Sequence, residues 1–573
     1  MVDRGAWGHK LHFLFTCIGF ATGLGNLWRF PGMAYENGGG SFVIPYICAS
    51  LILGFPLLYM ELSIGQFTRR GPAKCFKYFM PVLQGIGWAS AVVAYVVGIY
   101  YQMINVYSAV YIGKTLTGNS DDWVTCRNDW NTPYCESTYE NSRCASESGG
   151  NLSYFSNGSC WDDSYRKERR RLVELKTVLP PVSAAEEFFE QYVNEKSGGF
   201  DDFGGFNLKL LIGYFLVWAL TAVTLVKGVE LIGKISTVTA TVPFVIIAAI
   251  FVRAITLDGA ELGIQYFVTK PDLSRLLDPT TWEQAAIQIC YTLAIGFGGL
   301  LSLSSYNPPN HNCFRDALIV IFFDSFMSVF GGSAAFCTMG FMSNQTGLPL
   351  NELLQSGTSL SFVAYPQALH MMPLNNVWTF LFFLMFFCLG VTSQFGQSEV
   401  MCTAICDQIP RLHQHKAAVA VAVCFSSFLL GLPLCTRAGI YWFNLLNQFA
   451  GTFALFAIAF SEVLTLAYLY GLSEYEIDLH NMMGKPVKFI SRWFGPSGKF
   501  ILFNFKFISP IVLAILFVVT AREYIGFNMS YGSGARQYFY PPWANIVGWI
   551  FAVAPLATIP VFAVINIAFY AKK

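Results

Sequence analysis

Residues 19–26 read Gly19-Phe20-Ala21-Thr22-Gly23-Leu24-Gly25-Asn26 and lie inside an apolar run that begins near residue 11. A second apolar run contains Ala294-Ile295-Gly296-Phe297-Gly298-Gly299. Glycine weakens a helix because it loses more backbone entropy than other residues when the helix forms. Each stretch alone is compatible with close helix packing, since Gly19 and Gly23 form a GxxxG motif. Together the two stretches predict interrupted helices.

The composition is that of an integral membrane protein. Hydrophobic residues make up 54% of the 573 residues and charged residues 12%, against about 25% charged residues in soluble domains. With 36 Lys and Arg against 35 Asp and Glu, the chain has no charge excess that would favour a nucleic-acid partner. Most of the 15 cysteines lie in apolar runs, where they pack as small hydrophobic side chains.

Apolar runs of about 20 residues, which are long enough to cross a bilayer as helices, number roughly twelve. Low charge and the lack of polar–apolar alternation favour helices over a barrel. We therefore predict an all-α polytopic membrane protein with twelve transmembrane helices. A signal peptide over residues 1–24 is the weaker alternative, because an even number of spans already balances the topology. The spans begin near residues 11, 41, 83, 208, 231, 283, 312, 374, 415, 438, 500 and 541.

The short loops and chain ends place their Lys and Arg on one side, which predicts that both termini are cytoplasmic. The long polar loop over 116–207 is then extracellular and contains glycosylation sequons at Asn151 and Asn157. Cys126 and Cys135 in this loop are predicted to form a disulfide. Cys144 and Cys160 in the same loop are a possible second disulfide, and whether they bond stays open. Further sequons occur at Asn344 and Asn528, both in predicted outer loops.

The two glycine-interrupted spans are the first and the sixth, five spans apart. Interrupted spans at corresponding positions of two halves indicate a transporter site, where freed carbonyls coordinate cations and half-helix N-termini face an anionic group. We therefore predict a cytoplasmic N-terminus over 1–10 and a single transporter domain over 11–573. An enzyme is not favoured, because the sequence lacks HExxH, Walker A and Gly-x-Ser-x-Gly motifs, and His413 and His415 lie in a basic loop where solvation explains them.

Several motifs resemble the neurotransmitter:sodium symporter family across nearly the whole chain. The resemblance implies a leucine-transporter-like architecture, in which spans 1–5 and 6–10 are inverted repeats with broken helices 1 and 6, and spans 11 and 12 are accessory. The stretch from Cys126 to Cys135 also resembles the outer-loop disulfide of animal members. The motifs are Arg4-Gly5-Ala6-Trp7, Gly23-Leu24-Gly25-Asn26-Leu27-Trp28-Arg29-Phe30-Pro31, Glu36-Asn37-Gly38-Gly39-Gly40, Gly65-Gln66, Ser305-Tyr306-Asn307, Asn312-Cys313 and Arg315-Asp316-Ala317-Leu318.

The resemblance implies two sodium sites. Sodium is a hard cation that needs several oxygen ligands, and an intact helix cannot supply its bonded carbonyls. A hydroxyl taken singly is as well explained by a bond back to its own helix. The first site would use the Ala21 carbonyl with the side chains of Asn26, Thr292 and Asp324. The second would use the carbonyls of Gly19, Thr22 and Leu389 with the hydroxyls of Thr392 and Ser393.

The resemblance also implies a substrate that carries its own carboxylate. Monoamine members have an aspartate where this chain has Gly23, so an amino-acid or GABA-type member is expected rather than a monoamine type. Neutral amino acids are the favoured substrates, and GABA, betaine, taurine or creatine are the alternatives. For the aromatic residues, core packing is an equally good explanation. The pocket residues would be Phe20, Ala21, Gly23, Leu24, Gly25, Val97, Tyr101, Tyr291, Thr292, Ala294, Phe297, Ser393 and Gln397.

Gates and a chloride site follow from the same resemblance. Arg4 and Asp407, with Tyr306 nearby, match the inner gate of the family. Arg29 matches the outer-gate arginine, and Asn447 stands where the family usually has its acidic partner. The chloride-site candidates are Tyr46, Gln288, Thr292 and Ser328, with Asp324 in place of the usual Asn.

An ionised Asp324 would supply the negative charge that chloride otherwise brings, which predicts weak chloride dependence. The alternative is a protonated Asp that replaces the amide.

The expected function is sodium-coupled symport of a small amino-acid-like substrate across the plasma membrane, with two sodium ions and uncertain chloride. The complete sodium ligand sets argue against a non-transporting, receptor-like member. The lipid bilayer is the one macromolecular partner that the sequence indicates, and protein partners stay unknown.

Overall fold

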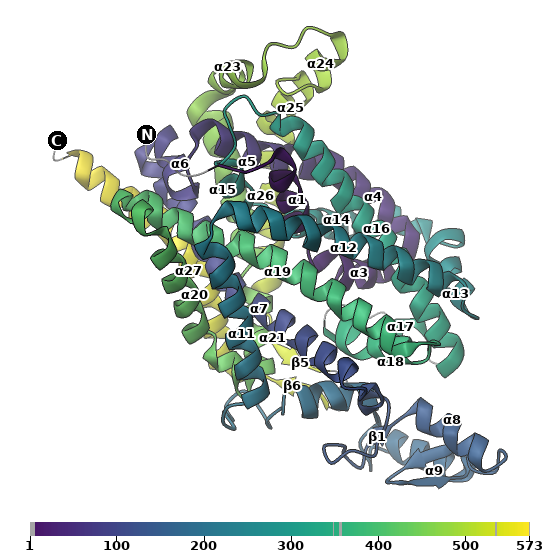
Figure 1. Ribbon diagram of the computed structural model, residues 1–573. Helices are drawn as coiled ribbons and strands as arrows, with labels where there is room; N and C mark the ends of the chain where they lie inside the picture. The colour runs from purple at the N-terminus through teal and green to yellow at the C-terminus, as the bar shows by residue number, and fades with distance from the viewer. Residues whose placement is uncertain (1–5, 348, 354–357, 533–535, 572–573) are drawn as a thin grey trace.

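The computed structural model describes residues 6–347, 349–353, 358–532 and 536–571. Its regular structure is almost entirely helical, with long helices that cross one another through the body of the molecule (Figure 1). Ten helical segments among the described residues are long and apolar enough to span a membrane. Two shorter ones complete the predicted twelve: the interrupted pair α14 (Pro279–Thr292) and α15 (Gly299–Ser304), and α20 (Lys416–Leu430).

The first five spans begin within a few residues of their predicted starts. Span 1 is broken into three pieces, and span 2 contains one π-helical turn, η2. The pieces are α1 (Lys10–Ala21), α2 (Gly25–Trp28) and α3 (Phe30–Glu36) for span 1; η1 (Gly39–Phe42), α4 (Val43–Ala49), η2 (Ser50–Gly54) and α5 (Phe55–Thr68) for span 2; η3 (Pro81–Leu83) and α7 (Gln84–Leu116) for span 3; α11 (Leu208–Val226) for span 4; and α12 (Val229–Ile255) for span 5.

The remaining spans follow the same pattern of long helices with local breaks. Spans 6 and 9 are the segments given above. The others are α16 (Cys313–Thr346) for span 7; α19 (Asn375–Gln408) for span 8; α21 (Gly439–Phe449), α22 (Thr452–Leu464) and η11 (Thr465–Gly471) for span 10; α25 (Lys499–Phe503), η12 (Asn504–Ile508) and α26 (Ser509–Tyr524) for span 11; and α27 (Pro542–Ala571) for span 12.

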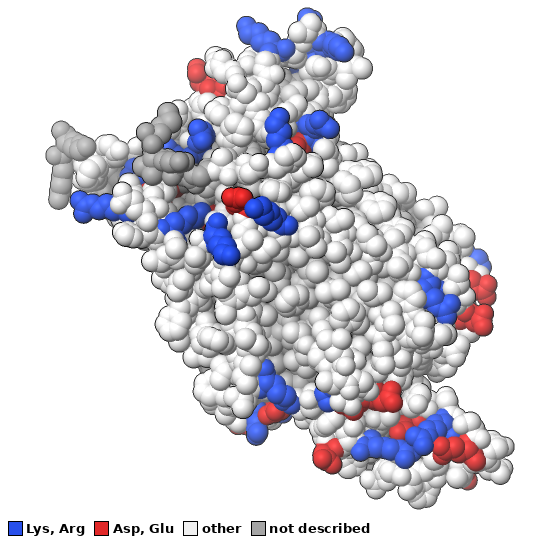
Figure 2. Space-filling model, viewed as in Figure 1, with Lys and Arg blue, Asp and Glu red and all other residues white. Residues whose placement is uncertain are grey.

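Charged side chains gather at the two ends of the bundle. Figure 2 shows Lys, Arg, Asp and Glu at either end of this face and a broad band with none of them between. The end called here the terminal end carries both chain termini, α6 (Pro72–Phe79) and α23 (Leu472–Met483) (Figure 1). The uncharged band has the character of a surface that faces the hydrocarbon core of a bilayer.

The opposite end carries a lobe built from the loop between α7 and α11, called here the loop lobe (residues 117–207). It contains three helices, α8 (Thr138–Glu147), α9 (Asp163–Glu174) and α10 (Ala184–Glu187), and a π turn, η5 (Phe188–Val193). Strands β1 (Cys135–Glu136) and β4 (Val182–Ser183) pair in parallel, and β2 (Tyr154–Ser156) pairs with β3 (Ser159–Trp161) antiparallel. A third small sheet outside the lobe joins β5 (Ser530–Tyr531) and β6 (Tyr538–Phe539).

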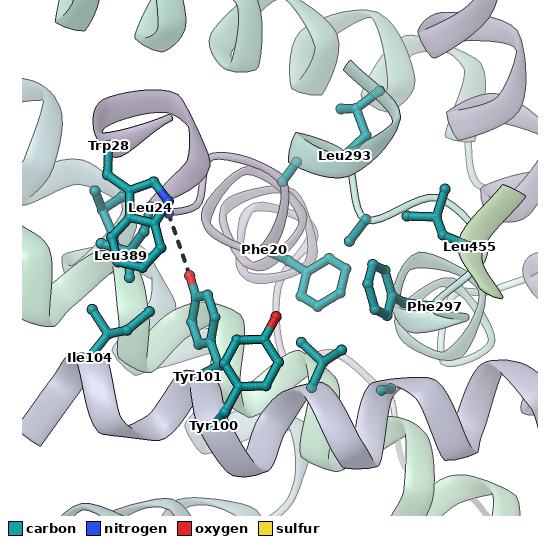
Figure 3. Packing of buried hydrophobic residues seen from close by; sticks show 14 of the residues in the cluster. Phe20, Leu24, Trp28, Tyr100, Tyr101, Ile104, Leu293, Phe297, Leu389 and Leu455 are labelled. Atoms are coloured by element: carbon teal, nitrogen blue, oxygen red, sulfur yellow. Dashed lines mark hydrogen bonds between the residues drawn. The ribbon is translucent and has the colours of Figure 1, made fainter. Parts of the chain in front are cut away.

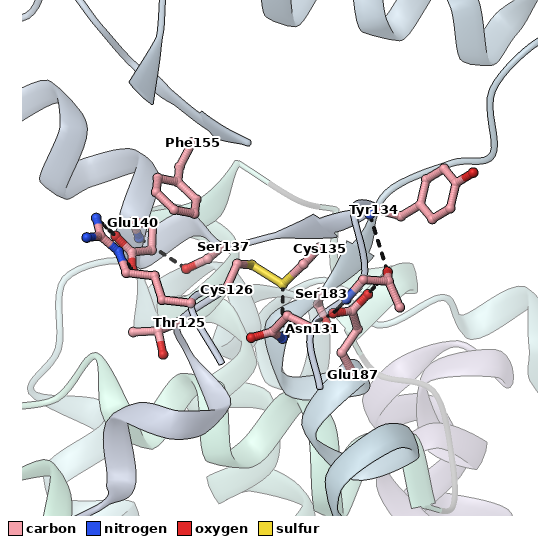
Figure 4. Close-up of a disulfide and its surroundings, with 12 residues drawn as sticks. Thr125, Cys126, Asn131, Tyr134, Cys135, Ser137, Glu140, Phe155, Ser183 and Glu187 are labelled. Atoms are coloured by element: carbon pink, nitrogen blue, oxygen red, sulfur yellow. Dashed lines mark hydrogen bonds and ion pairs between the residues drawn. A yellow bond between two sulfur atoms is a disulfide. The ribbon is translucent and has the colours of Figure 1, made fainter. Parts of the chain in front are cut away.

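Both predicted cysteine pairs are bonded in the loop lobe, Cys126 to Cys135 and Cys144 to Cys160. Figure 4 shows the first disulfide beside Asn131 and Glu187. Glu187 is buried and accepts hydrogen bonds from the Thr132 amide (2.9 Å) and from Asn131 Nδ2 (3.1 Å). This carboxylate therefore ties the disulfide loop to α10. The sequon residues Asn151, Asn157, Asn344 and Asn528 are all exposed.

Close packing at small residues brings the site-forming helices together. Helices α7 and α19 run along each other over much of their length. A Cβ added at Gly396 of α19 would lie 2.2 Å from the Phe20 ring, and one added at Gly299 of α15 would also lie 2.2 Å from it. Phe20 is thus clamped between two glycines, which fixes the end of α1 against spans 6 and 8.

Candidate functional site

The break in span 1 exposes backbone groups in the centre of the bundle. Helix α1 ends at Ala21, and Thr22 leaves the helical region with φ −78° and ψ 72°. The Gly23 amide turns back to donate to the Ala21 carbonyl at 2.9 Å. The helix resumes at Gly25, so the residues between lack the regular ladder of helical hydrogen bonds.

The break in span 6 needs three left-handed residues. Ala294, Gly296 and Gly298 have φ values of 50°, 80° and 69°, a region that glycine enters without strain. The Gly296 amide donates to Glu61 Oε1 of α5 at 2.7 Å, and Glu61 is fully buried. Sequence reasoning missed Glu61, although an acidic residue inside an apolar span is itself a functional signal.

A second buried carboxylate lies near the same break. Glu462 of α22 is 1% exposed, accepts a long hydrogen bond from Ser90 Oγ (3.5 Å) and is close enough to Glu61 for the two carboxyl groups to interact electrostatically. Glu61 Oε2 and Glu462 Oε2 are both buried, and no described group donates to either oxygen. Two such groups are unlike ordinary core residues, because an unpaired buried charge is costly.

The side chains predicted for the first sodium site meet around Asn26 and Asp324. Asn26 Nδ2 donates to Asp324 Oδ1 at 2.8 Å and to Ser328 Oγ at 2.8 Å. Thr292 Oγ1 lies 3.4 Å from Asp324 Oδ2. Asn26 Oδ1 is buried, and no group in the described chain donates to it. An oxygen without a donor next to a carboxylate is what a cation would require.

The chloride-site candidates share this cluster. The Tyr46 hydroxyl lies 3.2 Å from Asp324 Oδ2 and 2.9 Å from Ser328 Oγ. Gln288 stands slightly apart, because its Nε2 donates to the Gly25 carbonyl at 3.1 Å. Asp324 is 0% exposed. Its carboxylate therefore lies among the hydroxyl groups of the predicted chloride site.

Of the residues predicted for the second sodium site, Thr392 and Ser393 lie beside Gly19, but their hydroxyls differ in orientation. Ser393 Oγ lies 3.5 Å from the Gly19 carbonyl oxygen. Thr392 Oγ1 instead lies 2.6 Å from Thr239 Oγ1 of α12, and the Thr392 methyl group faces Gly19. The other two predicted ligands, Thr22 and Leu389, are buried.

The predicted carboxylate pocket centres on Gly23. The Leu24 amide donates to the Tyr101 hydroxyl at 3.4 Å, as Figure 3 shows. A Cβ added at Gly23 would lie 3.3 Å from Ser393 Oγ and 3.4 Å from the Tyr101 hydroxyl. The space beside Gly23 is thus bounded by a hydroxyl on two sides and by the amides of the break, which suits a carboxylate.

Aromatic and aliphatic residues surround the next part of the pocket. Phe20 and Phe297 approach each other in Figure 3, and both are 3% exposed. A Cβ added at Gly451 would lie 3.7 Å from Val97 and 3.8 Å from Phe297, so both side chains border this glycine. Gly25 faces Thr292 and Tyr291, and Ala294 lies in the break itself.

Two glutamines of α19 follow Ser393 towards the terminal end: Gln394 is the next residue, and Gln397 lies one helical turn on. A Cβ added at Gly98 of α7 would lie 3.1 Å from Gln394 Nε2 and 3.4 Å from Gln397 Oε1. Gln394 is 0% and Gln397 6% exposed, and no described group donates to either Oε1. Sequence reasoning named Gln397 but missed Gln394.

A cavity of about 1040 Å³ leads from the lobe end towards this centre, and Arg29 and Asn447, the residues predicted for the outer gate, both line it. The Arg29 guanidinium lies 4.9 Å from the centre of the Tyr291 ring, a cation–π contact. Tyr291 lines the cavity too. The pocket is therefore approached from the side of the loop lobe.

At the terminal end the structure describes only part of the predicted inner gate. Arg4 lies outside the described residues. Asp407 Oδ2 accepts a hydrogen bond from the Gly71 amide (2.6 Å), and Asp407 Oδ1 lies 3.3 Å from His413 Nε2. His413 is therefore a neighbour of the gate rather than a merely solvated loop residue.

Tyr306 belongs to a buried network with Glu399 and Lys416 that sequence reasoning missed. Its hydroxyl donates to Glu399 Oε1 (2.6 Å) and accepts from Lys416 Nζ (2.9 Å). Lys416 also forms an ion pair with Glu399 at 2.6 Å, and the Glu399 side chain is 0% exposed. Trp7 covers this side by donating from Nε1 to the Leu303 carbonyl at 3.2 Å. These contacts tie Trp7 and spans 6, 8 and 9 together at the terminal end.

Comparisons with known proteins identify the chain as similar to sodium-dependent transporters. A family model described as the sodium:neurotransmitter symporter family matches residues 4–569. The chain is 34% identical over 569 residues to the sodium-dependent transporter snf-5 of Caenorhabditis elegans, an alignment that covers 98% of this chain and 77% of that protein. It is also 34% identical to two proteins of Xenopus laevis, the sodium- and chloride-dependent glycine transporters 1 (99% of this chain, 85% of that protein) and 2 (98% and 69%).

The Glu399–Lys416 pair gives a prediction about stability. Lys416→Met leaves the fully buried Glu399 carboxylate without its cation and should destabilise the protein by about 2 to 4 kcal/mol. The double variant Glu399→Leu/Lys416→Met should recover most of this loss, because it removes both charges. The thermal unfolding midpoint of the purified protein in detergent measures both effects. Lys227→Met, an exposed lysine at the same end, is the matched control. A single Lys416 variant as stable as the wild type would contradict the assigned pairing.

Proposed function

Because the chain belongs to the sodium:neurotransmitter symporter family, we propose that it imports a neutral α-amino acid together with two sodium ions. Family membership makes the chain a multi-pass, sodium-coupled symporter rather than an enzyme, with twelve spans in a leucine-transporter-like fold. Two of the relatives are named as glycine transporters, which supports an amino-acid substrate. The proposal rests most directly on the cluster of Asn26, Thr292 and Asp324 at the break of span 1.

Asn26 supplies the strongest support for a first sodium ion. Its Oδ1 is buried without a donor, and its Nδ2 donates to the carboxylate of Asp324. The Ala21 carbonyl at the end of α1 would add a further oxygen. A second ion would lie between the Gly19 carbonyl and Ser393, and Thr392 would turn its hydroxyl from Thr239 towards that ion.

Two ions supply enough energy for strong accumulation. Each 100 mV is worth about 2.3 kcal/mol per charge, so two sodium ions at about 60 mV and a tenfold gradient yield about 5.5 kcal/mol. That energy corresponds to roughly 10⁴-fold accumulation of a neutral zwitterion.

The substrate carboxylate would lie beside Gly23, where the Leu24 and Gly25 amides and the Tyr101 hydroxyl surround it. Since this space contains no carboxylate to pair with a free amine, monoamines are poor candidates. The α-ammonium group would face the carbonyls of the broken helices.

The two glutamines indicate what kind of side chain the substrate carries. Gln394 directly follows Ser393 in α19, and Gln397 lies one turn, about 5 Å, beyond Ser393. Their amide oxygens are buried without donors, and an apolar side chain would leave them so. We therefore propose a neutral amino acid whose side chain ends in a hydrogen-bonding group, such as a hydroxyl or an amide.

Orientation follows from the same proposal. The terminal end would face the cytoplasm, because short loops there are rich in Lys and Arg, and the loop lobe with its disulfides and exposed sequons would face the outside of a plasma membrane. The cavity at Arg29 would then be the extracellular entrance, which would make the present conformation open to the outside.

The sodium assignment is tested at Asn26. Asn26→Ala removes the donor-free oxygen and should abolish sodium-driven uptake of a labelled amino acid while surface expression persists. Uptake in oocytes, with surface biotinylation, measures both. Thr241→Ala, an exposed hydroxyl of α12 that bonds only to its own helix, is the control and should transport normally. Normal sodium-driven uptake by the Asn26 variant would sink the assignment.

The substrate proposal is tested by competition. Serine, threonine, asparagine and glutamine should compete with the label better than valine or leucine, and GABA, betaine, taurine, creatine and monoamines should compete less. In Gln394→Met/Gln397→Met the preference for polar over aliphatic amino acids should fall by about tenfold or more, because an unpaired buried group costs about 1–3 kcal/mol. Met401→Leu in the same helix is the matched control. A wild type that prefers leucine would overturn the side-chain proposal and leave the sodium assignment untouched.

The role of Asp324 predicts weak chloride dependence. A permanent carboxylate beside the first sodium ion supplies the charge that chloride would bring, and a second anion there would be repelled. Replacing chloride with gluconate should therefore change wild-type uptake little, whereas Asp324→Asn should gain chloride dependence. If wild-type uptake collapses without chloride and the Asn variant behaves identically, Asp324 acts instead as a protonated replacement for an amide.

A further inference from the structure

A short helix at the terminal end is not explained by transport. Helix α24 (Phe489–Phe494) stands between α23 and span 11, beside α25 and away from the centre of the bundle (Figure 1). Most of its side chains are exposed: Phe489 is 76%, Ile490 72% and Phe494 62% exposed. These exposed fractions are as large as those of outward-facing apolar residues in the membrane spans, such as Val245 (65%) and Val564 (66%).

The helix separates apolar from basic residues. At about 100° per residue, Phe489, Ile490, Trp493 and Phe494 fall within an arc of about 140°, and Lys488, Ser491 and Arg492 fall on the opposite side. Such a division is typical of helices that lie in the plane of a membrane surface.

Charge around α24 is of one sign. Residues 484–499 contain Lys485, Lys488, Arg492 and Lys499 and no Asp or Glu. None of these four cations takes part in an ion pair among the described residues, and the nearest interaction of Lys499 is a cation–π contact with Trp493 at 5.0 Å. Figure 2 shows Lys and Arg side chains on this protruding part of the terminal end.

The loop after α24 is fixed to the membrane domain. The Tyr59 hydroxyl of α5 donates to the Pro496 carbonyl at 3.0 Å, and Ser497 Oγ lies 2.9 Å from His480 Nε2 of α23. Both contacts hold the loop after α24 against span 2 and α23 at the terminal end. The apolar arc is left largely exposed there, so a bilayer surface could cover it.

We propose that α24 lies in the headgroup region of the adjoining leaflet, with its aromatic arc inserted and with Lys485, Lys488 and Arg492 bound to anionic phospholipid headgroups. Unpaired cations next to an inserted aromatic face complement a negatively charged lipid surface. An aromatic residue such as Trp493 is typical of this depth. The inference does not depend on the transported substrate.

The test uses the full-length protein in nanodiscs of phosphatidylcholine alone or with about one fifth phosphatidylserine. A photoactivatable phosphatidylserine should label residues 485–499, and amide hydrogen exchange of this segment should be slower in the anionic nanodiscs. In Lys485→Gln/Lys488→Gln/Arg492→Gln, labelling should fall about tenfold, because each cation contributes to headgroup attraction. Lys10→Gln/Lys77→Gln/Lys227→Gln, three cations at the same end, is the matched control and should keep the wild-type labelling.

A second variant separates insertion from charge. Phe489→Ser/Phe494→Ser changes only exposed side chains, so the protein should fold, and exchange of the segment should become fast in both nanodiscs. Equal labelling of the wild type and the triple Gln variant would overturn the proposal. Equally fast exchange of the wild-type segment in both lipid mixtures would overturn it too, since that result would mean that the face binds something other than lipid.

Discussion

A polypeptide inside a bilayer must satisfy its own backbone hydrogen-bonding groups, and the two interrupted helices break this rule at the centre of the molecule. The breaks at Thr22–Leu24 and Leu293–Gly298 release carbonyls and amides that the rest of the structure has to meet. Tyr101 and Glu61 each take up one freed amide, at Leu24 and Gly296. The remaining freed groups are what a carboxylate and sodium ions would use, so the site is a direct consequence of the breaks.

The long spans could be predicted because length and apolarity alone decide whether a segment crosses a bilayer. Helix α7 ends at Leu116 and α11 begins at Leu208, where the polar composition of the loop begins and ends. The interior turns were harder to foresee. The π-helical turns at Ser50–Gly54, Thr465–Gly471 and Asn504–Ile508 lie in apolar runs that differ in no local pattern from regular helix. Tertiary packing, which the sequence does not display, decides between the two.

For a related reason, only part of the candidate site could be predicted from the sequence. Asn26, Thr292 and Asp324 could be named because the family resemblance implies ligands at these positions, and their side chains do meet. The orientation of a hydroxyl, as in Thr392, depends on a neighbour in another span, Thr239, that no spacing rule connects to it. Gln394 was missed because only its position against Gly98 gives it a role. Arg4 lies outside the described residues, so the predicted partner of Asp407 stays a prediction.

The buried carboxylates of Glu61, Asp324 and Glu399 limit how spans 1 and 6 can move. Glu61 holds the break of span 6, Asp324 stands at the break of span 1, and Glu399 joins Tyr306 to Lys416 at the terminal end. An unpaired charge in a low dielectric is costly, so each acid must keep a partner in every conformation that the protein visits. Movement of spans 1 and 6 therefore has to exchange partners rather than lose them. The sodium ion proposed beside Asp324 would be a mobile partner of this kind, which would give a physical reason for coupling between ion binding and helix movement.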